Sequence, residues 1–242
     1  MKKLVALLLL APALALASSA GLKLDRAPVD LHNLPSLQRG AQVFVNYCLN
    51  CHSANYMRYN RLSDLGLSEP QIRDNLMFAA DKVGATMTVA MRSKDAAQWF
   101  GVAPPDLTVV GRSRGADWLY TYLRDFYRDP ERPTGWNNLT FPSVAMPHVL
   151  MHLQGVQVLK MEEGKDAHGH ATHTPRLVLQ TPGSMTPVQY DQLVGDLVNY
   201  LVYMGEPAGM SRVQIGIAVL LVLSVFIAVS WLLKQAYWKD VH

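Results

Sequence analysis

Five consecutive residues constrain this chain more than any other feature: Cys48-Leu49-Asn50-Cys51-His52. Two thiols that are separated by two residues and followed at once by a histidine are the attachment signature of a c-type haem. The thiols add to the vinyl groups of the porphyrin, and the imidazole of His52 becomes an axial iron ligand. The sequence contains only these two cysteines, so none is left for a disulfide or a four-thiolate cluster. We therefore expect a domain that wraps one haem c bound through Cys48 and Cys51.

Two other kinds of site use paired cysteines. A thioredoxin-like Cys-x-x-Cys needs a βαβ context and has no use for His52. A structural zinc site needs two further ligands at a matching spacing. The residues before the motif instead predict one helix, because apolar side chains recur at helical spacing from Leu37 to Cys48. Haem attachment is favoured, since the motif occurs together with an export signal.

The first twenty residues have the composition of a secretory signal peptide. Lys2 and Lys3 are followed by an apolar stretch, and Ser18-Ser19-Ala20 is a small-residue cleavage site. We expect cleavage after Ala20, with an uncleaved anchor as the alternative. Residues 21–210 then form one domain outside the cytoplasm.

A second apolar segment, Val213–Leu233, contains 21 residues without a charge. As a helix it would span about 32 Å, which is enough for a bilayer core of about 30 Å. Arg212 and Lys234 bound it, and Trp231 and Trp238 suit an aromatic belt. We expect a transmembrane helix over residues 211–234 and a cytoplasmic tail over residues 235–242.

The net charge of +3 comes from the two ends of the chain. Residues 21–210 contain 17 basic and 18 acidic side chains, so the domain itself has a balance of −1. This distribution indicates targeting and anchoring segments and excludes a basic nucleic-acid surface.

Helix signals dominate residues 21–210. Proline or serine starts a helix near residue 35, Ser68 caps one that runs to about Phe78, and Ser93 caps one that runs to Phe100. A further helix is expected over residues 117–127, where Trp118, Tyr122 and Phe126 are spaced four apart. The last helix is delimited by the capping box Thr186–Gln189, by Pro187 and by Gly205. The predicted fold class is mainly α.

Two short strands are predicted over residues 156–161 and 176–180, which would form a small β-hairpin insertion. The polar connection between them contains His168, His170 and His173. A His-rich tract can bind a metal, but a solvated, mobile loop tip is the favoured interpretation because the sequence pattern fixes no carboxylate or cysteine near the histidines.

The motif supplies one axial ligand, His52, and does not determine the sixth ligand of the iron. Met146 is the favoured candidate, because Pro147 holds it in extended geometry and Pro142 stiffens the loop before it. A thioether ligand raises the reduction potential and suits electron transfer. The rivals are His148, His152, Met87 and Met91.

The sequence resembles the cytochrome c1 family, in its compact proteobacterial form. The resemblance rests on the Cys48–His52 motif, Ala103-Pro104-Pro105-Asp106-Leu107, Arg112-Ser113-Arg114, Ala145-Met146-Pro147 and the C-terminal anchor. It implies a class I cytochrome c-like haem domain, with Met146 as the axial methionine. It also implies that Arg114 lies near a haem propionate and that the Pro105 carbonyl holds a proton on His52. His148, which follows Pro147, departs from the family pattern, in which a small or apolar residue and a second proline often follow the methionine.

The resemblance further implies an electron-transfer subunit of the ubiquinol–cytochrome c oxidoreductase (bc1) complex. It would accept an electron from the Rieske iron–sulfur subunit, pass it to cytochrome c and pack against cytochrome b in a dimeric complex. It would not be catalytic alone. The expected location is the bacterial inner membrane, with a single span and the haem domain on the periplasmic side. The alternatives are a free-standing membrane-anchored cytochrome c that feeds a terminal oxidase or reductase, and a haem sensor or peroxidase.

Overall fold

The structure is a computed structural model that describes residues 23–165 and 171–239. The expected signal peptide, His168, His170 and the last three residues of the expected tail lie outside this range. The first half of the chain forms α2 (Leu34–Val43), η2 (Phe44–Cys48), β1 (Ala54–Arg58), η3 (Tyr59–Leu65), α3 (Glu69–Leu76), β2 (Thr86–Met87), α4 (Ser93–Phe100) and α5 (Val110–Ser113). The second half forms α6 (Ala116–Arg124), β3 (Phe126–Arg128), β4 (Trp136–Asn138), α7 (Met151–Gln154), β5 (Gly155–Lys165), β6 (Ala171–Pro182), α8 (Pro187–Gly205), η4 (Pro207–Met210) and α9 (Arg212–Trp238). The mainly α prediction is confirmed.

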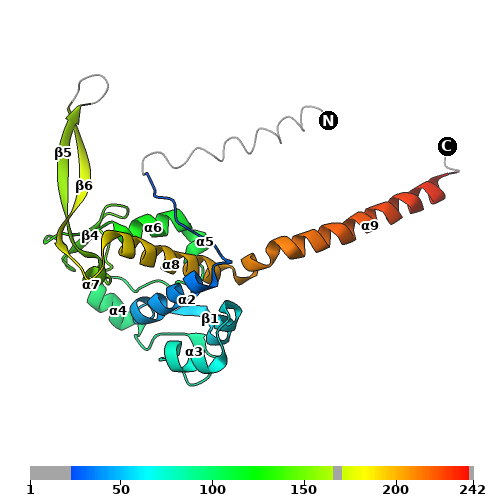
Figure 1. Ribbon diagram of the computed structural model, residues 1–242, viewed down its shortest axis with the longest axis horizontal. Helices are drawn as coiled ribbons and strands as arrows, with labels where there is room; N and C mark the ends of the chain where they lie inside the picture. Colours follow the sequence, from blue (N-terminus) through cyan, green and yellow to red (C-terminus); the bar gives the residue numbers. More distant parts are fainter. Residues whose placement is uncertain (1–22, 166–170, 240–242) are drawn as a thin grey trace.

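The centre of the domain is the crossing of α2 with α8, the first and the last long helix before the C-terminal helix (Figure 1). Gly40 lies at the crossing, where a Cβ atom would overlap the carbonyl oxygen of Asp196 and lie 2.7 Å from the Cβ of Tyr200. The absence of a side chain therefore lets the two backbones touch. Phe44, one turn further along, packs its ring 5.5 Å from that of Tyr200. This crossing fixes the end of α2, where Cys48 follows.

The boundaries of α8 follow the predicted capping signals. The Thr186 side chain accepts from the backbone N–H of Gln189, and the Gln189 side chain accepts from the backbone N–H of Thr186. The helix ends at Gly205, as predicted. Other helix ends differ from the prediction: α3 ends at Leu76, and α6 ends at Arg124 because Phe126–Arg128 pairs with Trp136–Asn138 as an antiparallel strand.

The β-hairpin is longer than predicted. Strands β5 and β6 pair antiparallel from Gly155 and Pro182 out to Lys165 and Ala171. Much of the connection that was expected to be a loop is therefore strand, and Glu162 pairs with Thr174 while Arg176 forms an ion pair with Glu162 at 2.6 Å. Polar cross-strand pairs extend the ladder past the apolar stretch that the sequence pattern detects.

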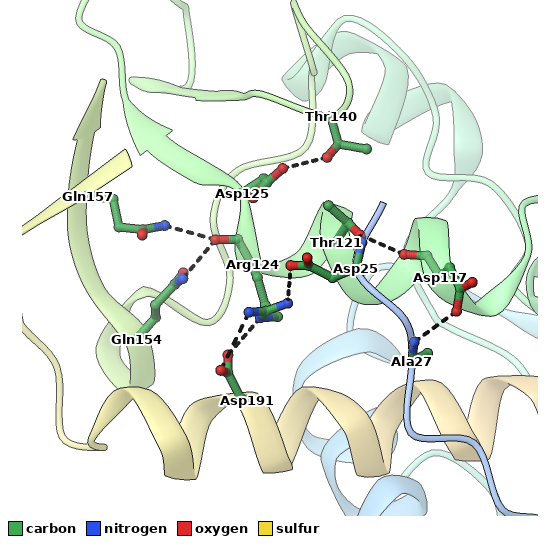
Figure 2. A network of polar contacts seen from close by, with 10 residues as sticks. All are labelled: Asp25, Ala27, Asp117, Thr121, Arg124, Asp125, Thr140, Gln154, Gln157 and Asp191. Carbon is green, nitrogen blue, oxygen red and sulfur yellow. Dashed lines mark hydrogen bonds and ion pairs between the residues drawn. The ribbon is translucent and has the colours of Figure 1, made fainter. Parts of the chain in front are cut away.

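Arg124 connects the N-terminal segment, α6, α8 and the base of the hairpin (Figure 2). Its guanidinium donates to Asp191 at 2.6 Å and to Asp25 at 2.7 Å. Its carbonyl accepts from the side chains of Gln154 and Gln157, each at 2.9 Å. The network holds the hairpin base against the end of α6.

The C-terminal helix α9 projects away from the domain (Figure 1) and is long and apolar enough to cross a membrane. Its side chains are not buried against the rest of the described chain. Glu206, just before it, forms ion pairs with Arg112 of α5 at 2.5 Å and with Arg212 of α9 at 2.8 Å. These ion pairs connect the start of α9 to α5.

Candidate haem-binding site

The two cysteines and His52 occupy one tight turn at the end of the first helix. The helix widens at η2, where the N–H of Leu49 bonds the carbonyl of Phe44 at 2.9 Å. The carbonyl of Cys48 then accepts from the N–H groups of Cys51 at 3.1 Å and His52 at 2.8 Å. The backbone therefore holds both thiols and the imidazole in the short arc that one porphyrin edge requires.

Both thiols are neutral in this environment. Burial, with a smaller contribution from the neighbouring Cys51, raises the pKa of Cys48 to about 12. Burial also raises the pKa of Cys51. Thiol–disulfide enzymes require the opposite shift, toward the thiolate. The pair therefore lacks the electrostatics of a redox-active Cys-x-x-Cys.

The ring of His52 is oriented by a backbone group 53 residues away. The distance between His52 Nδ1 and the Pro105 carbonyl oxygen is 2.7 Å. A carbonyl oxygen only accepts, so Nδ1 must be the donor, and a neutral ring then keeps its lone pair on Nε2. Burial lowers the pKa of His52, with partial opposition from the Pro105 carbonyl and Asp106. The ring is thus prepared as a neutral nitrogen ligand, as metal-bound histidines are in other proteins.

The segment that contains Pro105 is bonded to the residues after the motif at three further points. Leu107 N–H donates to the Ser53 carbonyl at 2.9 Å. The Asn55 N–H donates to the Asp106 carboxylate at 2.7 Å, and the Tyr56 N–H donates to the Thr108 hydroxyl at 3.3 Å. The Pro105 carbonyl is therefore fixed in position by its neighbours rather than by the one bond to His52.

Met146 lies on a loop that buried polar contacts hold in place. Asn138 is fully buried; its side chain donates to the Tyr122 carbonyl at 2.8 Å and accepts from the Phe141 N–H at 2.9 Å. Ser143 has a φ of 63°, a left-handed conformation that is unfavourable for serine. The Arg132 side chain donates to its carbonyl at 3.0 Å and helps to hold it. Such strain is found where the surrounding structure imposes a conformation.

The sulfur of Met146 contacts Tyr122, a residue that the sequence did not indicate as part of the site. The Tyr122 hydroxyl on α6 donates to Met146 Sδ at 3.3 Å. Burial raises the pKa of Tyr122 well above its usual value, so the phenol keeps its proton. The four-residue aromatic spacing of α6 indicated a buried face, but nothing in it indicated which side chain the tyrosine would meet.

Arg114 lies just before α6, with its side chain exposed. Its guanidinium carbon lies 4.9 Å from the centre of the Trp118 ring and 5.6 Å from that of Phe141. Among the described residues, no carboxylate lies within ion-pair distance of Arg114. The structure thus brings Arg114 to the aromatic face that leads to Met146, and Pro105 to His52. Both Cys48 and Met146 pack against the same buried core.

The rival ligands lie in different surroundings. Met87 is fully buried in β2, and its sulfur accepts from the Tyr200 hydroxyl at 3.7 Å. His148 is buried between the Phe126 ring, stacked at 4.9 Å, and the Trp136 ring at 5.1 Å. Its Nε2 finds no hydrogen-bond partner among the described residues, and burial lowers the pKa of His148 to about 4. Met91 is partly exposed and His152 is exposed.

The donor set fits a covalent haem c. Two neutral thiols that are separated by two residues can form thioethers, and the neutral His52 ring has Nε2 free for the iron. Met146 Sδ accepts one hydrogen bond and retains a second lone pair. In the described part of the chain, no three His, Cys, Asp or Glu side chains form a group that could hold a metal ion by themselves. His173 lies on β6, opposite Glu163.

Comparison with known proteins identifies the family. The sequence model of the Cytochrome C1 family matches residues 25–170 and 181–241. The chain is 50% identical to "Cytochrome c1" of Allochromatium vinosum over the full length of both proteins. It is 52% identical to a protein of Nitrosomonas europaea named "Ammonia monooxygenase gamma subunit", over 100% of this chain and 98% of the other. It is 30% identical to "Cytochrome c1" of Rhodospirillum rubrum, over 87% and 83% of the two chains. This chain belongs to the cytochrome c1 family, whose members are membrane-anchored haem c subunits for electron transfer in bc1 complexes.

Proposed function

We propose that this chain carries single electrons from a Rieske iron–sulfur subunit to a cytochrome c, through one haem c bound covalently at Cys48 and Cys51. The observation that carries the proposal is the 2.7 Å bond between His52 Nδ1 and the Pro105 carbonyl, because it prepares the histidine of the motif as an iron ligand. When bound, the haem supplies an iron centre that changes its oxidation state by one electron.

His52 Nε2 and Met146 Sδ are the proposed axial ligands. A neutral imidazole and a thioether together favour a high potential and leave no open coordination position for a substrate. The domain then has to bind, orient and shield the group, and needs no general acid, base or nucleophile. The chain is not catalytic alone; quinol oxidation belongs to the assembled complex.

Arg114 is the proposed partner of a haem propionate. Its guanidinium lies over the rings of Trp118 and Phe141, which support its planar face and leave its N–H edge free. A carboxylate at that edge would receive a charge-assisted hydrogen bond. The absence of an acidic partner among the described residues supports this role. Pro105 acts through its carbonyl, which accepts the hydrogen bond from His52 Nδ1.

The proposed topology has four parts: a signal peptide over residues 1–20, a periplasmic domain over residues 21–210, a transmembrane helix over residues 211–234 and a cytoplasmic tail over residues 235–242. The basic residues Lys234 and Lys239 near the end of α9 support a cytoplasmic tail. The exposed α9 would pack against cytochrome b in a dimeric complex. Its location would be the bacterial inner membrane.

The ligand assignment is tested by spectra of the matured haem protein and its Met146→Leu variant. We expect the oxidised wild type to show the weak long-wavelength band of a sulfur–iron bond, and the variant to lose it. The reduced variant should also bind carbon monoxide, which the wild type should not. An unchanged variant spectrum would reject Met146 as the ligand, and carbon monoxide binding by the wild type would favour the sensor or peroxidase alternative.

The partner assignment is tested by purifying the tagged full-length chain from membranes. We expect cytochrome b and an iron–sulfur protein to copurify, and quinol to reduce the haem only when both are present. Haem reduction without these partners would favour the free-standing cytochrome. Copurification with a monooxygenase would instead support the assembly that is named for the Nitrosomonas europaea relative.

A further inference from the structure

A column of stacked groups on one side of α6 ends at the sulfur of Met146. Arg114 lies 4.9 Å above the Trp118 ring, and Trp118 stacks on Tyr122 with ring centres 4.8 Å apart and an interplanar angle of 10°. The Tyr122 hydroxyl then donates to Met146 Sδ at 3.3 Å. Trp118 and Tyr122 are four residues apart, so one helical turn places the two rings face to face.

The column leaves the Tyr122 ring little freedom. The ring also forms an edge-to-face pair with Phe126, at 5.2 Å, and Tyr122 is 9% exposed. Trp118 is held in turn by Arg114 and by the Phe141 ring, which meets it at 6.1 Å and 75°. Phe141 belongs to the loop of Met146, so the column also attaches this loop to α6.

We propose that Tyr122 is a positioning residue for the Met146 sulfur, and that Trp118, covered by Arg114, keeps the Tyr122 hydroxyl on that sulfur. The inference rests on the proposed role of Met146 as an axial ligand. The hydrogen bond draws electron density from the sulfur, which makes the thioether a weaker donor. A weaker donor stabilises oxidised iron less, so the bond raises the reduction potential.

The test is a redox titration of the full-length haem protein and its Tyr122→Phe variant. The variant keeps the ring and its stacking and removes only the hydroxyl. At a fixed applied potential near the midpoint potential of the wild type, we expect the ratio of reduced to oxidised haem to fall about two- to tenfold. A change of this size corresponds to the net free energy of one hydrogen bond. The long-wavelength sulfur–iron band should remain, with a shifted maximum. The control is Tyr203→Phe, since the Tyr203 hydroxyl is bonded to the Arg61 carbonyl and to Asp64, away from Met146.

The role of Trp118 is tested by a double-mutant cycle. Trp118→Leu should lower the ratio of reduced to oxidised haem, but less than Tyr122→Phe does. Trp118→Phe keeps an aromatic face and should therefore retain most of the wild-type ratio. Once the Tyr122 hydroxyl is absent, Trp118→Leu should produce no further fall, because it acts through that hydroxyl. Additive effects would overturn the role of Trp118. If Trp118→Leu does not accumulate, Trp118→Met, which also lacks the aromatic face, is compared in the same two backgrounds and decides the same point.

The failure of this inference is distinguishable from that of the proposed function. If Met146→Leu removes the band but Tyr122→Phe leaves the potential unchanged, Met146 is the ligand and the positioning role of Tyr122 is overturned. If Met146→Leu leaves the band unchanged, the ligand assignment is wrong and the inference is overturned with it.

Discussion

Asp125, the residue that follows α6, illustrates how a single half-buried charge affects the stability of this domain. Its carboxylate accepts from the Thr140 hydroxyl at 2.6 Å (Figure 2). Burial raises the pKa of Asp125 nevertheless, and the Thr140 bond and the charge of Arg124 oppose the rise only in part. The folded state therefore binds the proton of this carboxyl more tightly than the unfolded state does.

We predict that Asp125→Asn is more stable than the wild type at pH 7. Because the folded pKa is raised, the cost of the charged carboxylate is fully present above that pKa and disappears as the pH falls toward about 4. The difference in the free energy of unfolding between the variant and the wild type should therefore disappear over the same pH range. Denaturant unfolding at pH 7 and pH 4 measures it, with Asp74→Asn on the exposed face of α3 as the control. A variant that is less stable at pH 7 would contradict the prediction.

At the scale of the elements, the domain depends on how closely α2 approaches α8. The contact at Gly40 determines the position of the last turn of α2, and the haem motif begins at Cys48, the last residue of η2. The Phe44 ring of η2 packs 5.5 Å from the Tyr200 ring of α8, so a change in the separation of the helices would also displace the residues that lead into the haem motif.

We predict that Gly40→Ala lowers the free energy of unfolding by about 1–3 kcal/mol, the usual cost of overpacking a core. The added methyl group meets the carbonyl of Asp196 and the Cβ of Tyr200, and neither is a flexible side-chain end. Gly84→Ala is the matched control, because a Cβ there meets no atom within 4 Å. Denaturant midpoints of the two variants give the comparison. Equal midpoints would show that the helices can separate without cost.

At the scale of the whole molecule, the domain and α9 are joined through a short connection. The described side chains of α9 are exposed, and the contacts at its start involve η4 and the ion pairs of Glu206. The core that surrounds the motif is complete before α9 begins.

We predict that a chain ending at Ser211 fractionates as a soluble protein and keeps the visible spectrum and potential of the full-length protein. The exposed apolar surface of α9 is the proposed cause of membrane attachment, since its uncharged stretch matches the bilayer core in length. Fractionation after maturation, followed by optical and redox titration, provides the measurement. An altered spectrum in the shortened protein would show that α9 supports the haem site.

The sequence alone determined the features whose cause is local. The spacing of Cys48, Cys51 and His52 is a chemical requirement of attachment, the capping of α8 depends on Thr186 and Gln189, and the length of the apolar C-terminal segment is independent of any contact. Resemblance, rather than residue pattern, supplied the roles of Pro105 and Arg114. The prolines around Met146 had already favoured it as a ligand, and the resemblance added to that choice. All three roles stay predictions.

Only the tertiary structure decided what depends on contacts between distant segments. It brought the Pro105 carbonyl into hydrogen-bond distance of His52 Nδ1, and the Tyr122 hydroxyl into hydrogen-bond distance of Met146 Sδ. It also ended α6 at Arg124, although the aromatic spacing continues to Phe126, because pairing with Trp136–Asn138 satisfies the backbone of that segment as a strand. Helical periodicity and capping act within a few residues, whereas hydrogen bonds across the fold form only once packing has brought their partners together.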